Sequence, residues 1–447
     1  MPLQWLLDRF QACPHDDAVI WRDAVTTYGE LLRQIDAAHE FLSAQQVAAG
    51  ESVMLDADFS PTAVALLIAS LQQQLLVVPV ASHVVADRQD LARIAECSRR
   101  FHVSASGSYE TEHFSHRLGH QLLTTLRDAA SPGLVLFSSG STGRPKAAVH
   151  DVDSLVAKFK KPRHKQRLVT FLLFDHIGGF NTMMYGLANQ GCLITLEARD
   201  PDTVCRAIEQ HRAEVLPTSP IFLTLLLMSG RLDHYDLSSL KVINYSTEVM
   251  PESTLSQLNA RFPDVTFRQS YGLSEVGILR SQSRANDSVW IRVGGEDYQT
   301  RVVDGLLHIK ARSSMVGYLN APSPFDQDGW LNTHDEVEVD GRWFRFRGRQ
   351  SDIINVGGEK VYPAEVESVL FEVENIADAT VTKEPHPILG NIVVALVRLQ
   401  HEEDLQAVAS RIRKHCFSKL PDYKVPVKVL LDDGQRVTER FKKKRQD

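Results

Sequence analysis

Helix-like and strand-like hydrophobic patterns alternate along the first two-thirds of the chain. Residues 27–46 carry apolar side chains at helical spacing, and three consecutive glutamines divide the apolar stretch 62–85 into a helix (PTAVALLIASLQQQ) and a strand (LLVVPV). Other apolar runs predict strands at 52–55, 167–174, 192–196, 215–216 and 242–245, with helices at 178–189, 201–210 and 220–229. Strand-helix-strand units of this length are typical of mostly parallel sheets that have helices on both faces.

The pattern changes at about residue 289, where short alternating strands follow one another. Glycine or Asp-Gly separates the predicted strands 292–303, 306–311, 336–339 and 342–347, which is typical of antiparallel hairpins. After Gly348 a mixed pattern resumes, with strands at 352–356, 376–383, 391–399 and 428–431 and helices at 363–371 and 403–420. We therefore predict an α/β fold with two domains. The large N-terminal domain, 1–350, has mostly parallel sheets flanked by helices plus a small antiparallel barrel-like subdomain, and a small α+β C-terminal domain covers 351–447.

Composition excludes several classes of protein. A chain of 447 residues is too long for a single core, and 43% hydrophobic with 23% charged residues indicates a globular rather than a disordered chain. The net charge of −7 gives no reason to expect nucleic acid or an anionic membrane as the main partner. Five scattered cysteines without a CxxC pair indicate reduced thiols. Since there is no signal-peptide pattern and no unbroken apolar span, we expect a cytoplasmic protein without an integral membrane segment.

A loop rich in glycine and serine carries the first candidate chemistry. Residues 134–150 read LVLFSSGSTGRPKAAVH, so that an apolar strand leads into small and hydroxylated residues and then into Arg-Pro-Lys. Glycines let the backbone approach phosphate, hydroxyls donate hydrogen bonds and lysine supplies charge. The spacing excludes a Walker A motif, because Lys146 comes three residues after Gly143 and Pro145 interrupts the helix start. A plain Ser/Gly linker is the alternative. The predicted polyphosphate site consists of Ser138, Ser139, Gly140, Ser141, Thr142, Gly143 and Lys146.

A second motif, Tyr271-Gly272-Leu273-Ser274-Glu275, follows a predicted strand and lies one helix after the segment NYSTEVMP. It offers an aromatic face, a close backbone approach and a carboxylate that could hold a cation beside phosphates, although a structural turn could have the same residues. Together with the loop, these segments resemble the motifs of the adenylate-forming superfamily. That superfamily contains acyl- and aryl-CoA synthetases, stand-alone adenylation domains and luciferases.

The resemblance implies an ATP site at these motifs. In the family the aromatic residue of this motif, here Tyr271, packs on adenine, the hydroxyl of Ser274 meets the α-phosphate, and Glu275 binds Mg²⁺. The adenine amino group is usually reached by a residue at the position of Gln269. Further residues that the resemblance places at the nucleotide are Gly272, Ser246, Thr247 and Glu248.

Residues 329–335 (GWLNTHD) resemble the family's GW-x-x-TGD motif, whose aspartate accepts hydrogen bonds from both ribose hydroxyls. That aspartate is Asp335 here, and His334 stands where the family has glycine. A plain surface acid in a turn is the alternative for Asp335. Arg349 matches an arginine that contacts ribose, and Ser351 stands at the hinge of a mobile C-terminal domain, where the family usually has Asp or Lys.

Two C-terminal segments resemble elements that act in the two half-reactions. Gly357, Gly358 and Glu359 belong to a loop (GGEKVYPAEVE) that swings into the family's active site for transfer to a thiol, although an ordinary loop before a capped helix would look alike. In the tail 436–445 (RVTERFKKKR), residues 438–442 align with the family's Thr-x-x-Gly-Lys element, with Phe441 in place of the glycine. The lysine of that element bridges the carboxylate and the α-phosphate. Lys442 is the candidate, with two adjacent lysines leaving the register open, and a solvated chain end is the alternative.

The acyl pocket is expected near Phe174-Asp175-His176-Ile177-Gly178-Gly179. In acyl- and aryl-CoA synthetases a histidine before small residues lines the pocket, which selects His176, Gly178 and Gly179. In amino-acid-activating members a Phe-Asp pair presents its acid to the α-ammonium group, which would select Asp175. His176 as a plain helix cap is a third alternative.

The resemblance implies an acyl-CoA synthetase that uses ATP, Mg²⁺ and coenzyme A. The carboxylic acid would be converted to an acyl-adenylate with release of pyrophosphate, and Lys442, Glu275 and Thr142 would be catalytic. The acyl group would then pass to coenzyme A or, alternatively, to the phosphopantetheine arm of an acyl carrier protein. A kinase-type NTPase, which would release ADP, and a catalytically inactive regulatory relative are further alternatives. Apolar residues around the expected pocket favour an acid with an aliphatic or aryl tail.

Overall fold

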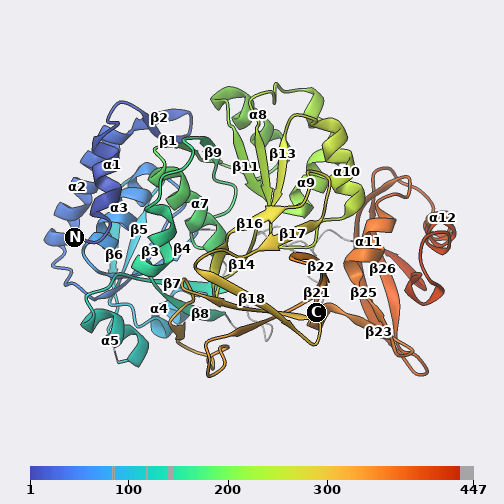
Figure 1. Ribbon diagram of the computed structural model, residues 1–447. Coiled ribbons are helices and arrows are strands. Elements are labelled where there is room, and N and C mark those ends of the chain that lie inside the picture. Colours follow the sequence, from blue (N-terminus) through green and yellow to red (C-terminus); the bar gives the residue numbers. More distant parts are fainter. Residues whose placement is uncertain (83, 85, 117–118, 139–144, 433–447) are drawn as a thin grey trace.

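Two mixed β-sheets and the helices around them build the larger part of the molecule (Figure 1). The computed structural model describes residues 1–82, 84, 86–116, 119–138 and 145–432. The first sheet has the strand order β13-β12-β11-β9-β10-β1-β2, and its neighbours are parallel except for β1 and β2. Its strands are β1 (Asp17–Trp21), β2 (Ala24–Thr27), β9 (Arg167–Val169), β10 (Cys192–Ile194), β11 (Val215–Thr218), β12 (Val242–Tyr245) and β13 (Thr266–Gln269).

The second sheet has the order β20-β8-β7-β4-β3-β5-β6, parallel from β7 to β5 and antiparallel towards both edges. Its strands are β3 (Ser52–Asp56), β4 (Leu76–Val80), β5 (Arg99–Val103), β6 (Tyr109–His113), β7 (Gly133–Ser138), β8 (Lys146–Asp151) and β20 (Gly317–Tyr318). The central strands β3 and β4 are buried along their whole length. Such nearly continuous apolar strands are typical of parallel sheets that are covered on both faces.

Helices lie between the two sheets and on their outer faces. One hydrophobic core joins residues of both sheets through α2 (Tyr28–Ala44), α3 (Pro61–Gln72) and α7 (Ile177–Ala188), with α1 (Gln4–Gln11) at its border. Because α3 is apolar on almost every side, it is buried from both directions. The remaining helical elements are α4 (Arg88–Ile94), α5 (Gln121–Asp128), α6 (Val152–Val156), η1 (Ala157–Phe159), α8 (Pro201–His211), α9 (Pro220–Met228), η2 (Arg231–Asp233) and α10 (Glu252–Arg261).

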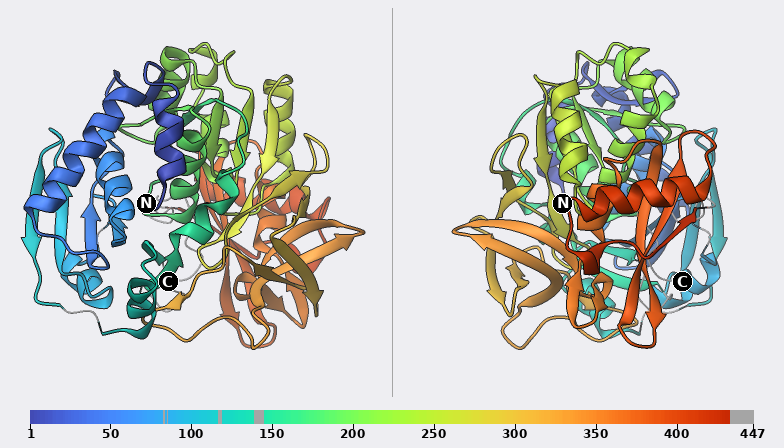
Figure 2. Two further views of the ribbon diagram at one scale, coloured as in Figure 1. Left: turned by 60° about the vertical axis from the view of Figure 1, so that its left-hand side comes forward. Right: turned by 90° about the vertical axis from the view of Figure 1, so that its right-hand side faces the viewer.

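An antiparallel unit follows the first sheet in sequence. The hairpin of β14 (Tyr271–Leu273) and β15 (Gly277–Leu279) leads into a sheet of order β16-β17-β22-β21-β19-β18, which projects from the body of the molecule in Figure 2. Its strands are β16 (Ser281–Ser283), β17 (Trp290–Val293), β18 (Tyr298–Val303), β19 (Leu306–Ala311), β21 (Leu331–Asp340) and β22 (Trp343–Arg349). It has its own hydrophobic core, to which Tyr271 contributes.

The C-terminal segment forms a separate core around the sheet β25-β26-β27. Its elements are η3 (Gln350–Asp352), β23 (Ile354–Val356), β24 (Glu359–Val361), α11 (Pro363–Leu370), β25 (Ile376–His386), β26 (Gly390–Leu399), α12 (Leu405–Phe417), η4 (Asp422–Lys424) and β27 (Lys428–Leu431). α11 packs against α10, where the Ser253 hydroxyl donates to the Ser368 carbonyl oxygen at 3.1 Å. α12 lies at the end of the molecule that is opposite α1 and α2 (Figure 1).

The α/β fold, with an antiparallel subdomain and a C-terminal α+β unit, is confirmed, whereas the boundary at residue 350 stays a prediction. Several predicted strands are wrong in extent. The prediction 336–339 covers only part of β21, and 376–383 stops three residues before the end of β25. The run 167–174 is a strand only to Val169, after which the chain leaves the sheet towards α7. The run 292–303 is two strands separated at Gly294-Gly295, where Gly294 has φ +142°, and 352–356 begins with a 3-10 turn. Between 86 and 131 the sequence analysis predicted none of the elements α4, β5, β6 and α5.

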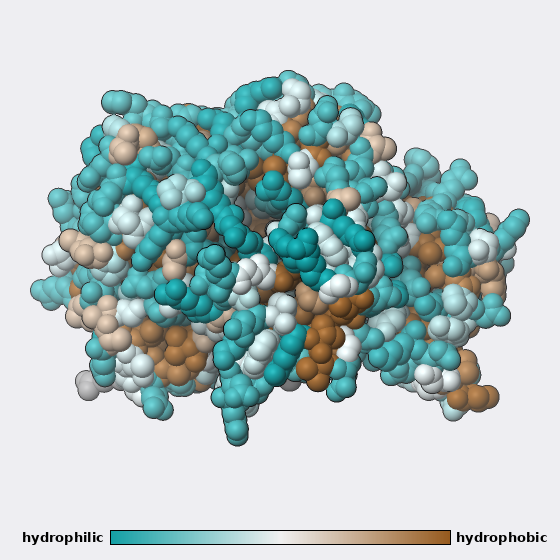
Figure 3. Space-filling view, viewed as in Figure 1, coloured by the Kyte–Doolittle hydropathy of each residue, from teal (hydrophilic) through white to brown (hydrophobic). Residues whose placement is uncertain are grey.

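The surface seen in Figure 3 is mainly hydrophilic, with small separate hydrophobic patches. Within the described part of the chain, no helix has both the length and the apolar character that crossing a bilayer requires.

Candidate functional site

Three residues that the sequence places far apart meet where β14, β21 and β22 come together, near the centre of Figure 1. The Tyr271 hydroxyl donates to Asp335 Oδ2 at 2.5 Å, and Arg349 Nε lies 3.3 Å from Asp335 Oδ1. Asp335 and Arg349 are partners across the β21–β22 ladder, which fixes their register. The ring of Phe346 stacks on Tyr271 with centroids 4.5 Å apart. The structure thus brings together the predicted adenine and ribose residues.

The electrostatics of this cluster follow from its burial. Asp335 is 9% exposed, and burial raises the pKa of its carboxyl group even though Arg349 and Tyr271 favour the charged form. Burial and the neighbouring Asp335 raise the pKa of Tyr271, so the phenol stays a donor. Each carboxylate oxygen has two lone pairs, so Asp335 can accept further hydrogen bonds from a vicinal diol. The cluster is therefore suited to a ribose.

Gln269 has a buried side-chain oxygen that bonds to no described residue. Its backbone is held by the hydroxyls of Ser283 and Ser281, and Gln269 is 6% exposed. Oε1 is buried without a hydrogen-bond partner in the described part of the chain. An unpaired buried acceptor is costly unless a ligand satisfies it. An adenine amino group would supply the missing donor.

The segment Ser246-Thr247-Glu248 leaves the same edge of the sheet as Gln269. β12 pairs with β13 so that Tyr245 faces Gln269, and Ser246 N donates to the Thr218 carbonyl oxygen at 3.2 Å. Thr247 has φ +84°, a left-handed conformation that is uncommon for a β-branched residue. Backbone strain of this kind is concentrated at functional sites.

Glu275 is connected to the end of the phosphate loop through Tyr318. The Tyr318 hydroxyl donates a short hydrogen bond to Glu275 Oε1, and the Lys146 ammonium lies 5.5 Å from the centre of the Tyr318 ring. Asn320 holds the same end of the loop, since its side chain accepts from Ala147 N at 3.0 Å and donates to the Pro145 carbonyl oxygen at 2.8 Å. The sequence analysis missed Tyr318 and Asn320. The available signal was an aromatic and an amide residue two positions apart, flanked by glycine, alanine and proline, in GYLNAP.

A buried histidine lies next to the backbone of Ser274. Burial lowers the pKa of His150, on β8, to about 4, although the neighbouring Ser274 backbone favours the protonated ring. The ring is therefore neutral. His150 was another residue that the sequence analysis did not single out.

The expected pocket residues surround the start of α7. His176 Nδ1 accepts from Gly178 N at 3.1 Å, so this side chain caps the helix. A Cβ atom on Gly179 would lie 1.8 Å from the Leu173 carbonyl oxygen, and one on Gly178 would lie 2.9 Å from Leu172 Cδ1. Gly179 is therefore required for packing, because a side chain there would meet backbone, whereas a side chain at Gly178 would need only the end of Leu172 to move. The alternative candidate, Asp175, is buried, and its Oδ2 accepts from Ala81 N at 3.4 Å.

The predicted hinge and thiol loop lie beyond β22. Ser351 is within η3, and its hydroxyl donates to Asp352 Oδ1 at 2.9 Å. Gly357 and Gly358 have φ +58° and +92°, a region that only glycine adopts without strain, and Glu359 after them is exposed.

A polar contact fastens this loop to the strand that carries Asp335. Glu336 accepts from Lys360 Nζ at 3.0 Å and from the Tyr362 hydroxyl at 2.5 Å. Burial and Glu336 raise the pKa of Tyr362, which keeps the phenol a donor. The side chain of Glu336 therefore joins β21 to β24.

Some predicted residues lie outside the described part of the chain. These are Ser139, Gly140, Ser141, Thr142, Gly143 and Lys442.

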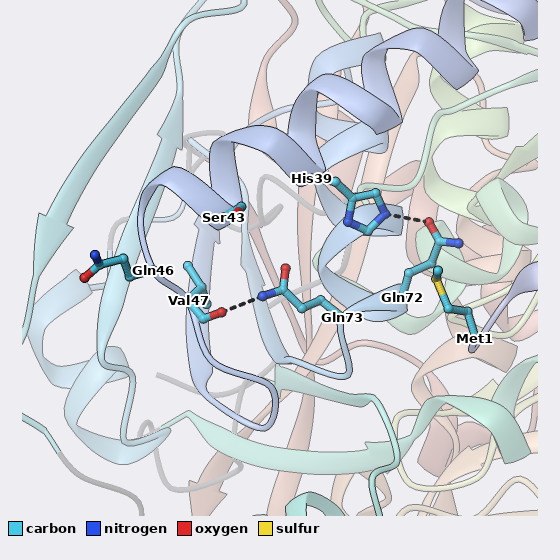
Figure 4. A pocket seen from close by; sticks show the side chains of 7 residues that line it. All are labelled: Met1, His39, Ser43, Gln46, Val47, Gln72 and Gln73. Atoms are coloured by element: carbon cyan, nitrogen blue, oxygen red, sulfur yellow. Dashed lines mark hydrogen bonds between the residues drawn. The ribbon is translucent and has the colours of Figure 1, made fainter.

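A cavity of about 650 Å³ lies away from all predicted site residues, between α2 and α3 (Figure 4). Its walls include a His39–Gln72 hydrogen bond of 3.1 Å. The lining residues are Met1, His39, Ser43, Gln46, Val47, Gln72 and Gln73. None of them belongs to a motif, so this cavity is not the candidate site.

The family model described as AMP-binding enzyme matches residues 7–305, and the model described as AMP-binding enzyme C-terminal domain matches residues 365–442. The chain is similar to an indoleacetate–CoA ligase of Aromatoleum aromaticum, with 28% identity over 329 residues, 68% of this chain and 64% of that protein. It is also similar to the long-chain-fatty-acid–CoA ligase FadD13 of Mycobacterium tuberculosis, with 27% identity over 325 residues, 67% of this chain and 63% of that protein. The matched region thus spans less than two thirds of either relative.

Solved structures share the fold over almost the whole chain. The anthranilate CoA ligase AuaEII in complex with anthranoyl-AMP aligns with a TM-score of 0.84 at 17% identity, covering 98% of this chain and 94% of that one. ATP-bound MatB from Rhodopseudomonas palustris aligns with a TM-score of 0.80 at 22% identity, covering 98% of this chain and 96% of that one.

Proposed function

Because the chain belongs to the family of AMP-binding enzymes, we propose that it activates a carboxylic acid with ATP and transfers the acyl group to coenzyme A. The carboxylate would attack the α-phosphorus of ATP, with loss of pyrophosphate, and the resulting acyl-adenylate would react with the thiol. The relatives of known name are CoA ligases, which favours coenzyme A over a carrier protein as the acceptor. We place the reaction in the cytoplasm, where the thiols of the five cysteines would stay reduced.

The observation that carries this proposal is the group formed by Gln269, Tyr271 and Asp335. It offers an unpaired buried amide oxygen on β13, an aromatic ring on β14 and a buried carboxylate on β21. Adenine and ribose together require this combination of an amino-group acceptor, a stacking face and a diol acceptor. Arg349 adds positive charge beside the ribose position.

Glu275 and Lys146 would act on the phosphates. Glu275 fits a Mg²⁺ ligand, because Mg²⁺ commonly uses one or two carboxylates together with substrate phosphate oxygens. Elsewhere in the described chain, no group of three His, Cys, Asp or Glu side chains forms an all-protein metal site. Bound Mg²⁺ would neutralise phosphate charge. Tyr318 orients the Glu275 carboxylate and lies under Lys146, so both charges are held at the exit of the phosphate loop.

The remaining roles rest on the sequence motifs. Thr142 would contact the leaving pyrophosphate, and Lys442 would bring the carboxylate and the α-phosphate together. After adenylation, the C-terminal unit would turn about Ser351 and present Gly357, Gly358 and Glu359 to the thiol. The Glu336 contact would hold that loop in place during transfer.

A carboxylate-dependent exchange of radioactive pyrophosphate into ATP tests the proposal. A panel of aliphatic, aryl and amino acids is offered with ATP and Mg²⁺, and thioester formation is then followed with coenzyme A and with a loaded carrier protein. We expect exchange with a subset of acids, AMP rather than ADP as product, and thioester with coenzyme A. ADP formation, or the absence of exchange with every acid while ATP still binds, would refute the proposal.

A further inference from the structure

Lys158 is a partly buried lysine that no motif includes. It lies in η1, and its Nζ donates to Asn181 Oδ1 at 2.6 Å and to the carbonyl oxygen of Ile278 at 2.7 Å. Both partners are neutral acceptors, and Nζ also lies 5.0 Å from the centre of the Phe159 ring. Protonated Nζ has three N–H donors, so one remains for a further oxygen acceptor.

The surroundings of Lys158 provide no negative charge. In the part of the chain that the structure describes, no carboxylate forms an ion pair with Nζ, and the charged group that acts on it is another cation, Arg163. Burial, followed by Arg163, lowers the pKa of Lys158 to about 7. A buried cation without a counterion is costly to stability, which a methionine of similar length would avoid.

The position of Nζ connects the nucleotide hairpin with the helix of the expected acyl pocket. Ile278 lies on β15 directly opposite Gly272 of β14, the residue after Tyr271. Asn181 lies on α7, which begins at His176 and packs against β15. Asn181 and Ile278 are only partly buried, so the two residues to which Lys158 donates lie at the edge of the core and not inside it. The ammonium therefore lies between the adenylate-forming motif and the helix that carries His176.

We propose that Lys158 determines substrate specificity by binding a second anionic group of the acid, at a distance from the carboxylate that reacts. This inference rests on the proposed function and specifies its substrate class. The acid would have an apolar body, in keeping with Phe180 and Met183 in the core beside α7, and a far end that carries a carboxylate or a similar anion. Asn181 and the Ile278 carbonyl would fix two of the N–H groups, and the ligand would take the third.

Matched acids test the proposal. Octanoate is compared with octanedioate, and 3-phenylpropanoate with 3-(4-carboxyphenyl)propanoate, in pyrophosphate exchange by the full-length protein. We expect the wild type to favour the dianionic member of at least one pair. In Lys158→Met, kcat/KM for that diacid should fall by about 10- to 100-fold, as for loss of a charge-assisted hydrogen bond, while the monoacid is unaffected or improved. Lys160→Met, which removes an exposed neighbouring lysine, should leave both values unchanged.

Two results would overturn the proposal. One is an equal loss for both members of a pair in Lys158→Met, which would assign Lys158 to the reacting carboxylate or to folding. The other is no preference for either diacid in the wild type. Calorimetric binding of the same acids without ATP separates this proposal from the general one. If exchange is absent but diacid binding depends on Lys158, the proposed reaction fails and the anion site stands, whereas loss of both refutes the site as well.

Discussion

Replacing Lys158 with methionine should change how the stability of the protein depends on pH. Burial lowers the pKa of Lys158 from 10.5 to about 7 in the folded protein, while the unfolded chain keeps the ordinary value. Between these two values the unfolded state binds a proton that the folded state lacks, so the free energy of unfolding rises with pH. The whole shift corresponds to about 5 kcal/mol. Of this destabilisation of the folded state, about 2 kcal/mol should disappear as the pH rises from 7 to 9.

At pH 7 two opposing effects decide how stable the variant is. Methionine removes the cost of the buried ammonium but leaves Asn181 Oδ1 and the Ile278 carbonyl oxygen without their donor, at about 1–3 kcal/mol each. Set against about 5 kcal/mol for the whole shift, these losses leave the variant between about 1 kcal/mol less stable and about 3 kcal/mol more stable than the wild type.

Urea unfolding at pH 7, 8 and 9 measures the effect. The difference in unfolding free energy, wild type minus Lys158→Met, should rise by about 2 kcal/mol across the series. Lys160→Met serves as the control, and its difference in unfolding free energy from the wild type should not change with pH. A constant difference for Lys158→Met would mean that Nζ stays protonated and hydrated, and it would refute the argument from burial. Octanedioate should bind the folded protein with Lys158 protonated. In the wild type it should therefore make the free energy of unfolding depend less on pH.

Four further substitutions test other contacts of the site. Asp335→Asn should raise the KM for ATP about 10- to 100-fold in the exchange assay, because the charged acceptor for ribose is lost. Glu336→Gln weakens the contact with β24, so transfer to coenzyme A should slow several-fold while exchange persists; Glu384→Gln, at an exposed ion pair, should alter neither step. Lys442→Ala should lower adenylation by about 10²- to 10³-fold but spare thioester formation from a supplied acyl-adenylate, and an equal loss in both steps would contradict its role. His334→Gly should raise the free energy of unfolding by up to about 1 kcal/mol in urea, because φ +57° strains a side-chain-bearing residue.

The sequence predicts best those elements that have a distinct hydrophobic pattern of their own. α3 and β4 were predicted within two residues, because an all-apolar helix and a buried strand have distinct patterns. Only 336–339 of β21 was predicted, because residues 329–335 were assigned to a motif. Within that segment His334 has φ +57°, and its backbone N donates to Asn332 Oδ1 at 2.8 Å. A histidine thus adopts a left-handed conformation that glycine would adopt without strain.

Contacts between distant segments could not be predicted in this way. Tyr318 comes forty-three residues after Glu275, and the two meet because β20 pairs with β8 and Met315 N donates to the Glu275 carbonyl oxygen at 2.7 Å. Its local sequence does not predict these contacts. Lys158 follows a helix of ordinary amphipathic spacing and is buried by α7 and β15, which arrive later in sequence. Burial of a single charged residue is a tertiary property, and one sequence carries no periodic signal for it.

Strand β21 shows how one element can serve both proposed half-reactions. Neighbouring side chains of a strand point to opposite faces, so Asp335 and Glu336 necessarily face different partners. Asp335 meets Tyr271 and Arg349 on the nucleotide side, while Glu336 meets Lys360 and Tyr362 of the thiol loop. The β21–β22 ladder shifts its register directly after Glu336, and the pairing then continues from Val337 opposite Phe346. If Asp335 accepts the ribose hydroxyls and Glu336 anchors the thiol loop, as proposed, the two groups are a fixed distance apart on one strand, and β21 would position the incoming thiol relative to the adenylate.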